Sequence, residues 1–385
     1  MSTTALVTGG NGFIGSHLVE YLQERGDKVL AMVRKTSNLD NLAGVDVEFR
    51  YAGLSDVEAL AVAMEGVDIV YHVAGLTAAF KPETMHEVNA QGTANVFAAA
   101  YQAKDGPTRV VYVSSLEAAG QSHPEVPRAE HHAPEPFTHY GRSKFAGEMA
   151  AWEAASIPAL LTEKNSRQGD LEIVIVRPPL VYGPRDQDVL QMIQSANWRI
   201  IATPLGRKGW ISAIHCHDLV RAIVLAGEKG EPLPGRFHSP EAHPEERSVE
   251  GGYWKHALEG GGQKSGDAAH ELSGDISKGI YFFDDGGRYT IGSFGQDAAA
   301  ALGKRAFTIA MPRPAIWMSA VAAECAGRIT GKAPALNRDK VTATFATGWW
   351  CDASKARKEL GFKAEMPLEK GLPQTIAWLR ENKIL

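Results

Sequence analysis

Val7-Thr8-Gly9-Gly10-Asn11-Gly12-Phe13-Ile14-Gly15 joins an apolar, strand-like segment at residues 5–8 to an amphipathic helical segment at residues 15–25. A glycine-rich turn between a strand and a helix is the local context that a phosphate-binding motif requires. The stretch therefore predicts a dinucleotide-binding turn at the start of the chain.

Three glycines of this turn each have an expected purpose. Gly9 permits the tight turn, Gly12 lets the backbone approach a pyrophosphate, and Gly15 allows close helix–strand packing. The first N–H groups of a helix have no partner within it and carry partial positive charge, so they attract phosphate. Phe13 and Ile14 are therefore expected to contact the cofactor together with the glycines.

Outward from the turn, short apolar runs alternate with helical patterns. The predicted strands are residues 5–8, 28–33, 68–73, 109–114 and 171–177, and the predicted helices are residues 15–25, 57–64, 87–101 and 140–155. Continuously apolar strands separated by helices indicate a parallel sheet that is covered on both faces. Right-handed crossovers then favour an α/β, doubly wound parallel sheet of the Rossmann type.

The second half of the chain has a less regular pattern. Residues 1–177 are predicted to form the dinucleotide-binding domain, to which residues 213–230 return, and residues 178–385 mainly a smaller C-terminal substrate-binding lobe. In that half the predicted strand is residues 279–283 and the predicted helices are residues 218–228, 293–302, 315–329 and 368–382. Residues 239–275 are rich in Gly, Glu, His and Ser, which indicates a mobile surface insertion. Residues 315–329 are too short to span a bilayer and suit a core or interface helix.

Composition narrows the classes of function. The 385 residues are 44% hydrophobic and 22% charged, as in an ordinary globular protein. A net charge of −5 makes no electrostatic case for binding nucleic acid or an anionic membrane surface. Three scattered cysteines and no signal peptide favour a reducing, cytoplasmic location. No histidine has the partner spacing of a metal site, so we expect no metal.

Three side chains form a candidate catalytic group. Tyr140 and Lys144 are four residues apart at the start of a predicted helix, so they lie on one face of it. A nearby ammonium favours the phenolate form of a tyrosine, which allows proton exchange near neutral pH. Ser115 follows a predicted strand, at the edge where open α/β sheets bind their ligands.

The Thr8–Gly15 spacing TGxxGxxG, the Tyr140–Lys144 pair and Ser115 together resemble the extended short-chain dehydrogenase/reductase family over nearly the whole chain. The resemblance includes residues 88–93, 177–184, 217–219 and 352–360. It implies that Tyr140 exchanges the proton and that Ser115 orients the substrate oxygen. It also implies that Lys144 lowers the pKa of Tyr140 and holds the nicotinamide ribose.

The end of the second predicted strand bears on the cofactor. A site for NAD would carry Asp or Glu there, whereas this chain has Arg34 and Lys35, which suit a 2′-phosphate. We therefore favour NADP over NAD. The resemblance further implies cofactor contacts at Leu54, Ala74 and Pro178, although Gly53 replaces the aspartate that the family often has before Leu54.

The residues after Ser115 bear on the substrate. Family dehydratases carry an Asp-Glu pair there, but this chain has Leu116 and Glu117, which argues against dehydration. Residues 114–120, 312–314 and 347–352 resemble the 3β-hydroxysteroid dehydrogenase branch, which implies a secondary alcohol or ketone of a hydrophobic small molecule, steroid-like or a long-chain keto acid, as substrate. A nucleotide-sugar 4-epimerase with tightly bound NAD is the alternative, and a non-catalytic nucleotide-binding protein a minor one. The family commonly forms homodimers, here through residues 87–101 and 140–155.

Overall fold

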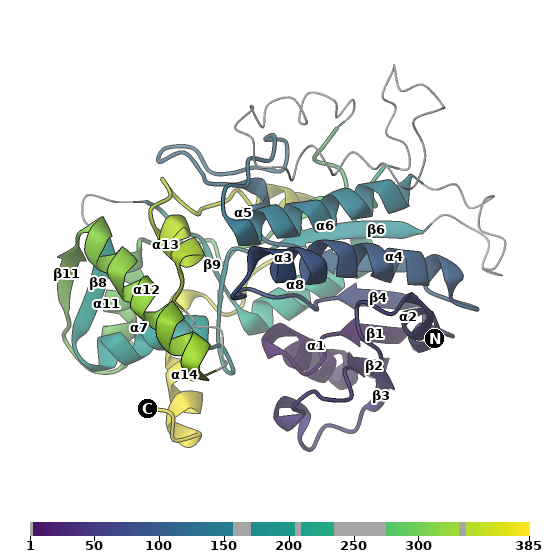
Figure 1. Ribbon diagram of the computed structural model, residues 1–385, viewed down its shortest axis with the longest axis horizontal. Helices are drawn as coiled ribbons and strands as arrows, with labels where there is room; N and C mark the ends of the chain where they lie inside the picture. Colours follow the sequence, from purple (N-terminus) through teal and green to yellow (C-terminus); the bar gives the residue numbers. More distant parts are fainter. Residues whose placement is uncertain (1–2, 157–170, 205–208, 235–274, 331–335) are drawn as a thin grey trace.

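The computed structural model describes residues 3–156, 171–204, 209–234, 275–330 and 336–385. The predicted insertion, residues 239–275, lies outside these ranges except for its last residue. In Figure 1 a large sheet with its helices occupies the right of the molecule, and a smaller lobe lies at the left.

Seven described strands form one parallel sheet, which confirms the predicted doubly wound fold. They are β1 (Thr4–Thr8), β2 (Lys28–Val33), β3 (Glu48–Tyr51), β4 (Ile69–His72), β5 (Arg109–Val113), β6 (Glu172–Arg177) and β10 (Ile280–Phe282). Their order is β10-β6-β5-β4-β1-β2-β3. β3 is absent from the predicted strands because its sequence, EFRY, mixes charge with aromatic residues and lies at the edge of the sheet, where burial is incomplete.

Alternate residues of the central strands supply two separate cores. Ala5 and Val7 of β1 pack in one core with α1 (Phe13–Glu24) and α8 (Cys216–Lys229). Leu6 packs on the other face with α2 (Val57–Ala63), α4 (Gly92–Gln102) and α6 (His139–Ala155). This alternation follows from the two-residue period of a strand, and it leaves the strand ends free to carry a site.

The helix predicted at residues 87–101 is longer and less regular. It begins as α3 (Pro82–His86), continues as a π-helical turn, η2 (Glu87–Gln91), and then becomes α4. Asn89 lies in the π-helical turn, where its side-chain amide bonds both the N–H and the C=O of Leu76 at 2.7 and 2.8 Å. The irregular turn thus holds the loop that follows β4.

The lobe has a third core, formed by residues such as Val189, Ile193, Phe294 and Leu372. Its elements are β7 (Leu180–Tyr182), α7 (Asp188–Asn197), β8 (Ile200–Pro204), β9 (Ala213–His215), α11 (Ile291–Ala301), β11 (Phe307–Met311), α12 (Arg313–Thr330), α13 (Arg338–Thr344) and α14 (Leu368–Glu381). The turn η5 (Ala356–Leu360) instead packs in the core that contains α1 and α8. β7 pairs with β9, and β8 pairs with β11. Within the described residues, no helix has both the length and the apolar character needed to cross a membrane.

Candidate active site

The carboxyl ends of the parallel strands share one edge of the sheet, where the predicted site residues lie. β2 continues the sheet on one side of β1, and β4 lies on the other side. Ligands of open α/β sheets bind at such a reversal of strand order. Gly9 and Ala74 meet there, because a Cβ on Gly9 would lie only 2.9 Å from the Cα of Ala74.

The glycine turn has the geometry of a phosphate cradle. Gly9 has a φ of +65°, which strongly favours glycine, and its carbonyl accepts a 2.9 Å bond from the Gly12 amide. A Cβ on Gly12 would have only the Gly9 carbonyl oxygen within 4 Å, so space remains beside it. A Cβ on Gly15 would lie 2.1 Å from that same oxygen. Gly15 is therefore required by the turn itself, which corrects the expectation of helix–strand packing.

Helix α1 begins at Phe13 without a side-chain cap. Its N-cap residue is Gly12, and no acidic residue lies in its first turn. The partial positive charge at its start is therefore not neutralised by the helix's own residues. Phe13 and Ile14, both half-buried, provide the first backbone groups of this end, which fits a bound pyrophosphate.

The predicted specificity residues lie close to this turn. Arg34 and Lys35 directly follow β2 and are exposed. Two hydrogen bonds tie their loop to the turn: the Asn11 amide donates to the Asn38 carbonyl at 2.9 Å, and the Asn41 amide donates to the Asn11 carbonyl at 3.0 Å. The loop that begins with Arg34 and Lys35 is therefore attached to the glycine turn.

Leu54 and Pro178 occupy two other strand ends of the same edge. The Leu54 carbonyl accepts a 2.7 Å bond from Asn95, and a Cβ on Gly92 would touch the Leu54 side chain at 3.0 Å. Pro178 follows β6, and its carbonyl accepts a 2.9 Å bond from the Leu116 amide. Both residues line the sheet edge, although no contact in the chain itself assigns them a cofactor atom.

Two adjacent serines end β5, and the structure separates their surroundings. The Ser114 hydroxyl donates to the Glu148 carboxylate at 2.5 Å, inside the core. Ser115 caps α5 (Leu116–Ala119), accepting a 3.1 Å bond from the Glu117 amide, and its hydroxyl is close enough to Tyr140 to lower the pKa of the phenol. The geometry therefore brings Ser115, and not Ser114, to Tyr140.

The protonation of Tyr140 differs from the expectation. Burial raises the pKa of Tyr140, and the neighbouring Glu117 carboxylate raises it further, while the Ser115 hydroxyl lowers it. Lys144 is not among the groups that shift this pKa. Without a bound ligand, Tyr140 thus stays protonated well above neutral pH.

Lys144 is directed toward the sheet and not toward the Tyr140 hydroxyl. Its side chain is buried, and its Nζ donates to the Val113 carbonyl at 2.8 Å and lies 4.4 Å from the Tyr112 ring centre. Burial lowers the pKa of Lys144 to about 7. A Cβ on Gly75, just after β4, would lie 3.7 Å from this Nζ, so the amino group faces the crevice beside Ala74.

A buried ion pair supports the site from beneath, and the sequence analysis does not predict it. The Arg177 guanidinium bonds both oxygens of Glu148, with Nε at 2.8 Å and Nη2 at 2.5 Å. Both side chains are buried, and the Ser114 hydroxyl donates a further hydrogen bond to the Glu148 carboxylate. The pair connects the ends of β5 and β6 to the middle of α6, one turn beyond Lys144.

Leu116, whose identity argues against dehydration, is a packing residue. It is 3% exposed and belongs to a small cluster with Ala119, Phe282 and Cys351, against which Trp349 packs. This apolar residue stands where a dehydratase would carry its acid.

The start of α6 carries two further groups that the sequence analysis does not identify. Asp339 of α13 accepts the backbone N–H of His139 at 2.8 Å and that of Tyr140 at 3.0 Å. Thr138 caps the helix and donates to the Glu117 carboxylate at 2.6 Å. The Thr138 cap is visible in the sequence as a hydroxyl residue before a helix, but Asp339 is about 200 residues away.

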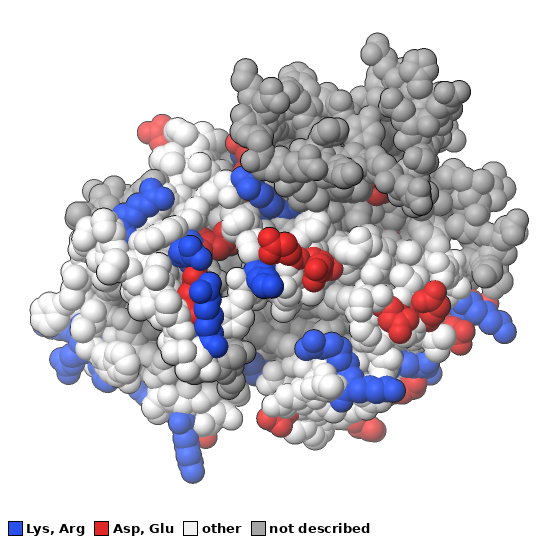
Figure 2. All heavy atoms as spheres, viewed as in Figure 1, with Lys and Arg blue, Asp and Glu red and all other residues white. Residues whose placement is uncertain are grey.

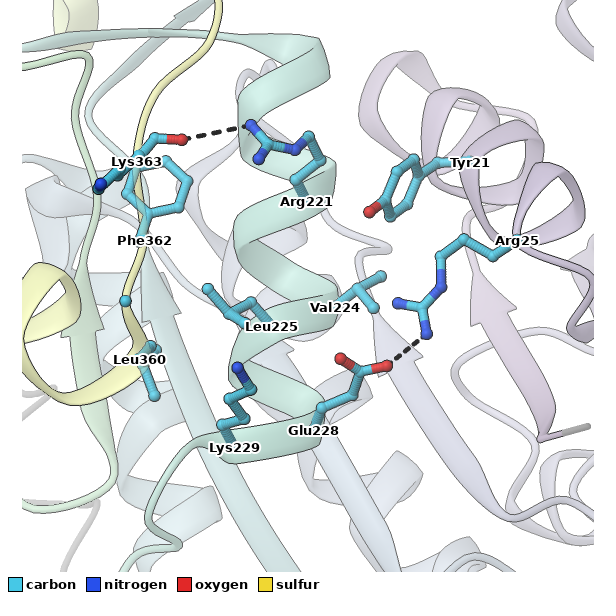
Figure 3. A pocket seen from close by; sticks show the side chains of 11 residues that line it. Tyr21, Arg25, Arg221, Val224, Leu225, Glu228, Lys229, Leu360, Phe362 and Lys363 are labelled. Atoms are coloured by element: carbon cyan, nitrogen blue, oxygen red, sulfur yellow. Dashed lines mark hydrogen bonds and ion pairs between the residues drawn. The ribbon is translucent and has the colours of Figure 1, made fainter. Parts of the chain in front are cut away.

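Two pockets have different relations to this site. One of about 190 Å³ lies between α1, α8 and residues 360–363, distant from the crevice. Figure 3 shows that its guanidinium groups are already bonded, Arg25 to Glu228 and Arg221 to the Lys363 carbonyl. A second pocket, of about 320 Å³, lies between α12–α13 and the start of α6 and includes His139 and Asp339. It adjoins the backbone that carries Tyr140.

Among the described residues, no group of three or more His, Cys, Asp or Glu side chains is placed to hold a metal ion. The groups available at the sheet edge are the glycine turn, the hydroxyls of Ser115 and Tyr140, and the buried amine of Lys144. Together with the doubly wound sheet, these features define a dinucleotide-binding α/β protein.

Comparison with known proteins is consistent with that class. Residues 5–237 match the model of the NAD dependent epimerase/dehydratase family. The chain belongs to this family of nicotinamide-dependent enzymes, and it is of the extended short-chain dehydrogenase/reductase type.

Individual relatives share part of the chain. A ceramide reductase of Caulobacter vibrioides is 30% identical over 218 residues, 57% of this chain and 59% of that protein. The sterol demethylase protein B of Methylococcus capsulatus is 34% identical over 188 residues, 48% of this chain and 53% of that protein. Human 3 beta-hydroxysteroid dehydrogenase type 7 is 29% identical over 251 residues, 58% of this chain and 65% of that protein. The chain thus covers between about half and two thirds of these relatives.

Solved structures share the whole fold. The crystal structure of gox2253 has a TM-score of 0.69 at 25% identity and covers 99% of both chains. A UDP-glucose 4-epimerase from Thermotoga maritima has the same TM-score at 19% identity, covering 99% of this chain and 100% of that one. At such identity the second likeness concerns the fold alone.

Proposed function

We propose that the protein is an NADP-dependent oxidoreductase that interconverts a secondary alcohol and a ketone on a hydrophobic molecule. The observation that carries the proposal is the neighbouring Ser115 and Tyr140 hydroxyls at the carboxyl edge of the sheet, with the Lys144 amine facing the same crevice. A protonated phenol beside a hydroxyl donor can bind and protonate a carbonyl oxygen.

The chain's own residues suit the two halves of this reaction. In the reducing direction the Tyr140 hydroxyl donates its proton to the substrate oxygen, and Ser115 orients that oxygen through a hydrogen bond. The nicotinamide, when bound, supplies or accepts the hydride. Because Lys144 does not set the pKa of Tyr140, its proposed role is to hold the ribose near Gly75.

The cofactor fits the cradle described above. Gly9, Gly12, Gly15 and the start of α1 at Phe13 and Ile14 would hold the pyrophosphate. The cations Arg34 and Lys35 would hold a 2′-phosphate, which is why we favour NADP over NAD. Leu54, Ala74 and Pro178 would contact other parts of the dinucleotide.

The proposed substrate class draws on the relatives. Their names specify ceramide, sterol and 3 beta-hydroxysteroid chemistry, all on largely apolar molecules. The packed Leu116 also supports a redox reaction without dehydration, since it cannot donate a proton. Pairing of two copies through α4 and α6 remains a prediction. Eleven of the seventeen residues of α6 are already buried in the single chain, so only a narrow stripe of it is available for such a contact.

The test is NADPH-dependent reduction of a panel of apolar ketones, including a 3-ketosteroid and a long-chain keto acid. Tyr140→Phe should lower kcat by about a hundredfold or more, because the proton donor is lost. Tyr51→Phe, which removes an exposed hydroxyl on β3, should leave kcat unchanged. Full turnover by the Tyr140 variant would refute the proposed role.

The epimerase alternative has its own signature. A nucleotide-sugar 4-epimerase would co-purify with stoichiometric NAD, which appears on denaturation, whereas the proposed oxidoreductase should release its cofactor on dialysis. A protein that binds NADPH but reduces nothing on the panel would instead favour the non-catalytic alternative.

A further inference from the structure

Exposed large apolar side chains cluster on one part of the lobe. Within the described residues there are thirteen, and eight of them fall in three short segments, 198–200, 307–309 and 317–329. The eight are Trp198, Ile200, Phe307, Ile309, Trp317, Met318, Val321 and Ile329. Single exposed apolar residues are normal, but a cluster indicates a binding surface.

The strand pair β8–β11 presents one part of this cluster. Phe307 pairs with Ile200, and Ile309 pairs with Ala202, so these side chains share a face. Ile201 lies on the opposite face, where it is only 4% exposed and packs against Gly295 of α11. The outward face is the apolar one, and Phe307 is 76% exposed.

Helix α12 presents the other part. Its sequence suggests a core or interface helix, and much of it is exposed. Met318, Cys325 and Ile329 follow one another at helical spacing, and all three are exposed. The charged residues Glu324 and Arg328 instead line the pocket beside α6. A surface helix ordinarily carries mainly polar residues outward, so this row of three exposed apolar residues is unusual.

These two parts are joined through Pro312, and we call them together the apolar lobe surface: Trp198, Ile200, Phe307, Ile309, Met318, Val321, Cys325 and Ile329. In Figure 1 β8, β11 and α12 all lie in the lobe at the left, away from the seven-stranded sheet.

The charges around the apolar lobe surface are mostly positive. Arg199, Arg305 and Arg313 are exposed, and none has an ion pair with another described residue. The one carboxylate of α12, Glu324, is already paired with Arg338 at 3.0 Å. Figure 2 shows more blue than red over this lobe, although the whole chain carries a net charge of −5.

We propose that the apolar lobe surface docks on an anionic lipid bilayer, with α12 lying in the plane of the interface. Apolar and aromatic side chains with a cationic rim are the features that bind such interfaces. Local charge, and not net charge, governs this contact, which is why the chain's overall balance conceals it. A second copy of the chain fits less well, because pairing these surfaces would bring the arginines of both copies together.

The docked surface and the second pocket lie on two sides of the same helix. Trp317, Glu324 and Arg328 of α12 face the pocket, which also includes His139, the neighbour of Tyr140. If the substrate is hydrophobic, which rests on the proposed function, the bilayer would present it beside the entrance to the site.

The test is co-sedimentation of the full chain with phosphatidylcholine vesicles and with vesicles that contain one quarter phosphatidylglycerol. We expect binding to the anionic vesicles, weaker binding to the neutral ones, and a decrease as salt is raised. Phe307→Ser should weaken binding to both by about tenfold. Arg305→Gln should weaken binding to the anionic vesicles alone, by about fivefold.

Matched controls lie on the other side of the molecule. Val62→Ser removes an exposed apolar side chain of α2, and Lys28→Gln an exposed cation of β2; neither should change binding. Absence of binding to either vesicle, or equal losses in the controls, would overturn the proposal. So would a dimer in sedimentation equilibrium that Phe307→Ser dissociates, since the occupant would then be a second copy. Ketone reduction is measured separately, so loss of one property does not imply loss of the other.

Discussion

Glu117 is the charged side chain that influences the pKa of Tyr140 in the candidate site. Its carboxyl group accepts the Thr138 hydroxyl at 2.6 Å, and burial raises the pKa of Glu117 to about 7. Its negative form raises the pKa of Tyr140 in turn. Glu117 therefore gains or loses its proton near neutral pH, whereas Tyr140 stays protonated there.

Replacing Glu117→Gln should lower the pKa of Tyr140, because a negative neighbour is removed. We expect the pH profile of alcohol oxidation, which needs the phenolate, to move to lower pH by about one unit. Steady-state rates between pH 6 and 10 would measure this shift. An unchanged profile would show that Glu117 does not influence Tyr140.

The same substitution should change stability in a pH-dependent way. The pKa of Glu117 is higher in the folded chain than the ordinary value of 4.5, so the folded state binds this proton more tightly. The stabilisation of the folded chain by protonated Glu117 is fully present below pH 4.5 and is lost as the pH rises through about 7. The Gln variant should lack that decline.

For single residues, the sequence identifies the candidate groups of the site but not their environment. Ser115, Tyr140 and Lys144 could be found because their spacing reflects local geometry, a strand end and one helical turn. The direction of the Lys144 side chain could not be found, since it depends on the Val113 carbonyl and the Tyr112 ring. Tertiary burial also decides the pKa of Tyr140, against the expected effect of Lys144.

Among the elements, α13 has the most direct effect on the site. Its residue Asp339 accepts the first two backbone N–H groups of α6, so the lobe fixes the end of the helix that carries Tyr140. An acceptor at this end also complements the helix dipole. The lobe is therefore attached by hydrogen bonds to the helix that carries Tyr140.

Asp339→Ala should lower kcat by about tenfold, because a small displacement of a reacting group is costly. Asp339→Asn, which keeps one acceptor oxygen, should restore part of the loss. The matched control is Asp56→Ala, which removes the cap of α2, where Asp56 accepts the Ala59 amide at 2.9 Å. That control should cost about 1 kcal/mol of stability and leave kcat unchanged. Equal kcat in all three variants would exclude a positioning role for Asp339.

Elements with a strong apolar period were predictable and others were not. β2 and the start of α2 match their predicted positions because their patterns are regular. β3 lacks an apolar run, and the π-helical turn at Glu87–Gln91 depends on Asn89 bonding to a distant loop. The exposure of α12 could not be inferred either, because an apolar helix looks alike whether it faces a core or a partner.

For the molecule as a whole, cofactor binding should raise the free energy of unfolding. A ligand that binds only the folded chain adds about 2.7 kcal/mol at a hundred times its Kd. NADPH should therefore raise the melting temperature by several degrees, and more than NADH does at equal concentration. Arg34→Ala should abolish the difference, while Lys104→Ala, an exposed cation elsewhere, should preserve it. Equal shifts by both cofactors in the unmodified chain would contradict the NADP preference.

The large sheet also sets an order for synthesis on the ribosome. β6 ends at Arg177, but its outer neighbour β10 begins only at Ile280, after much of the lobe has been made. At ordinary elongation rates, the edge of β6 waits about 5 to 20 seconds for its partner. An unpaired strand edge, here with four consecutive apolar residues at 173–176, invites pairing with other chains during that interval. Expression yield and the need for chaperones should therefore depend on the length of chain between these two strands.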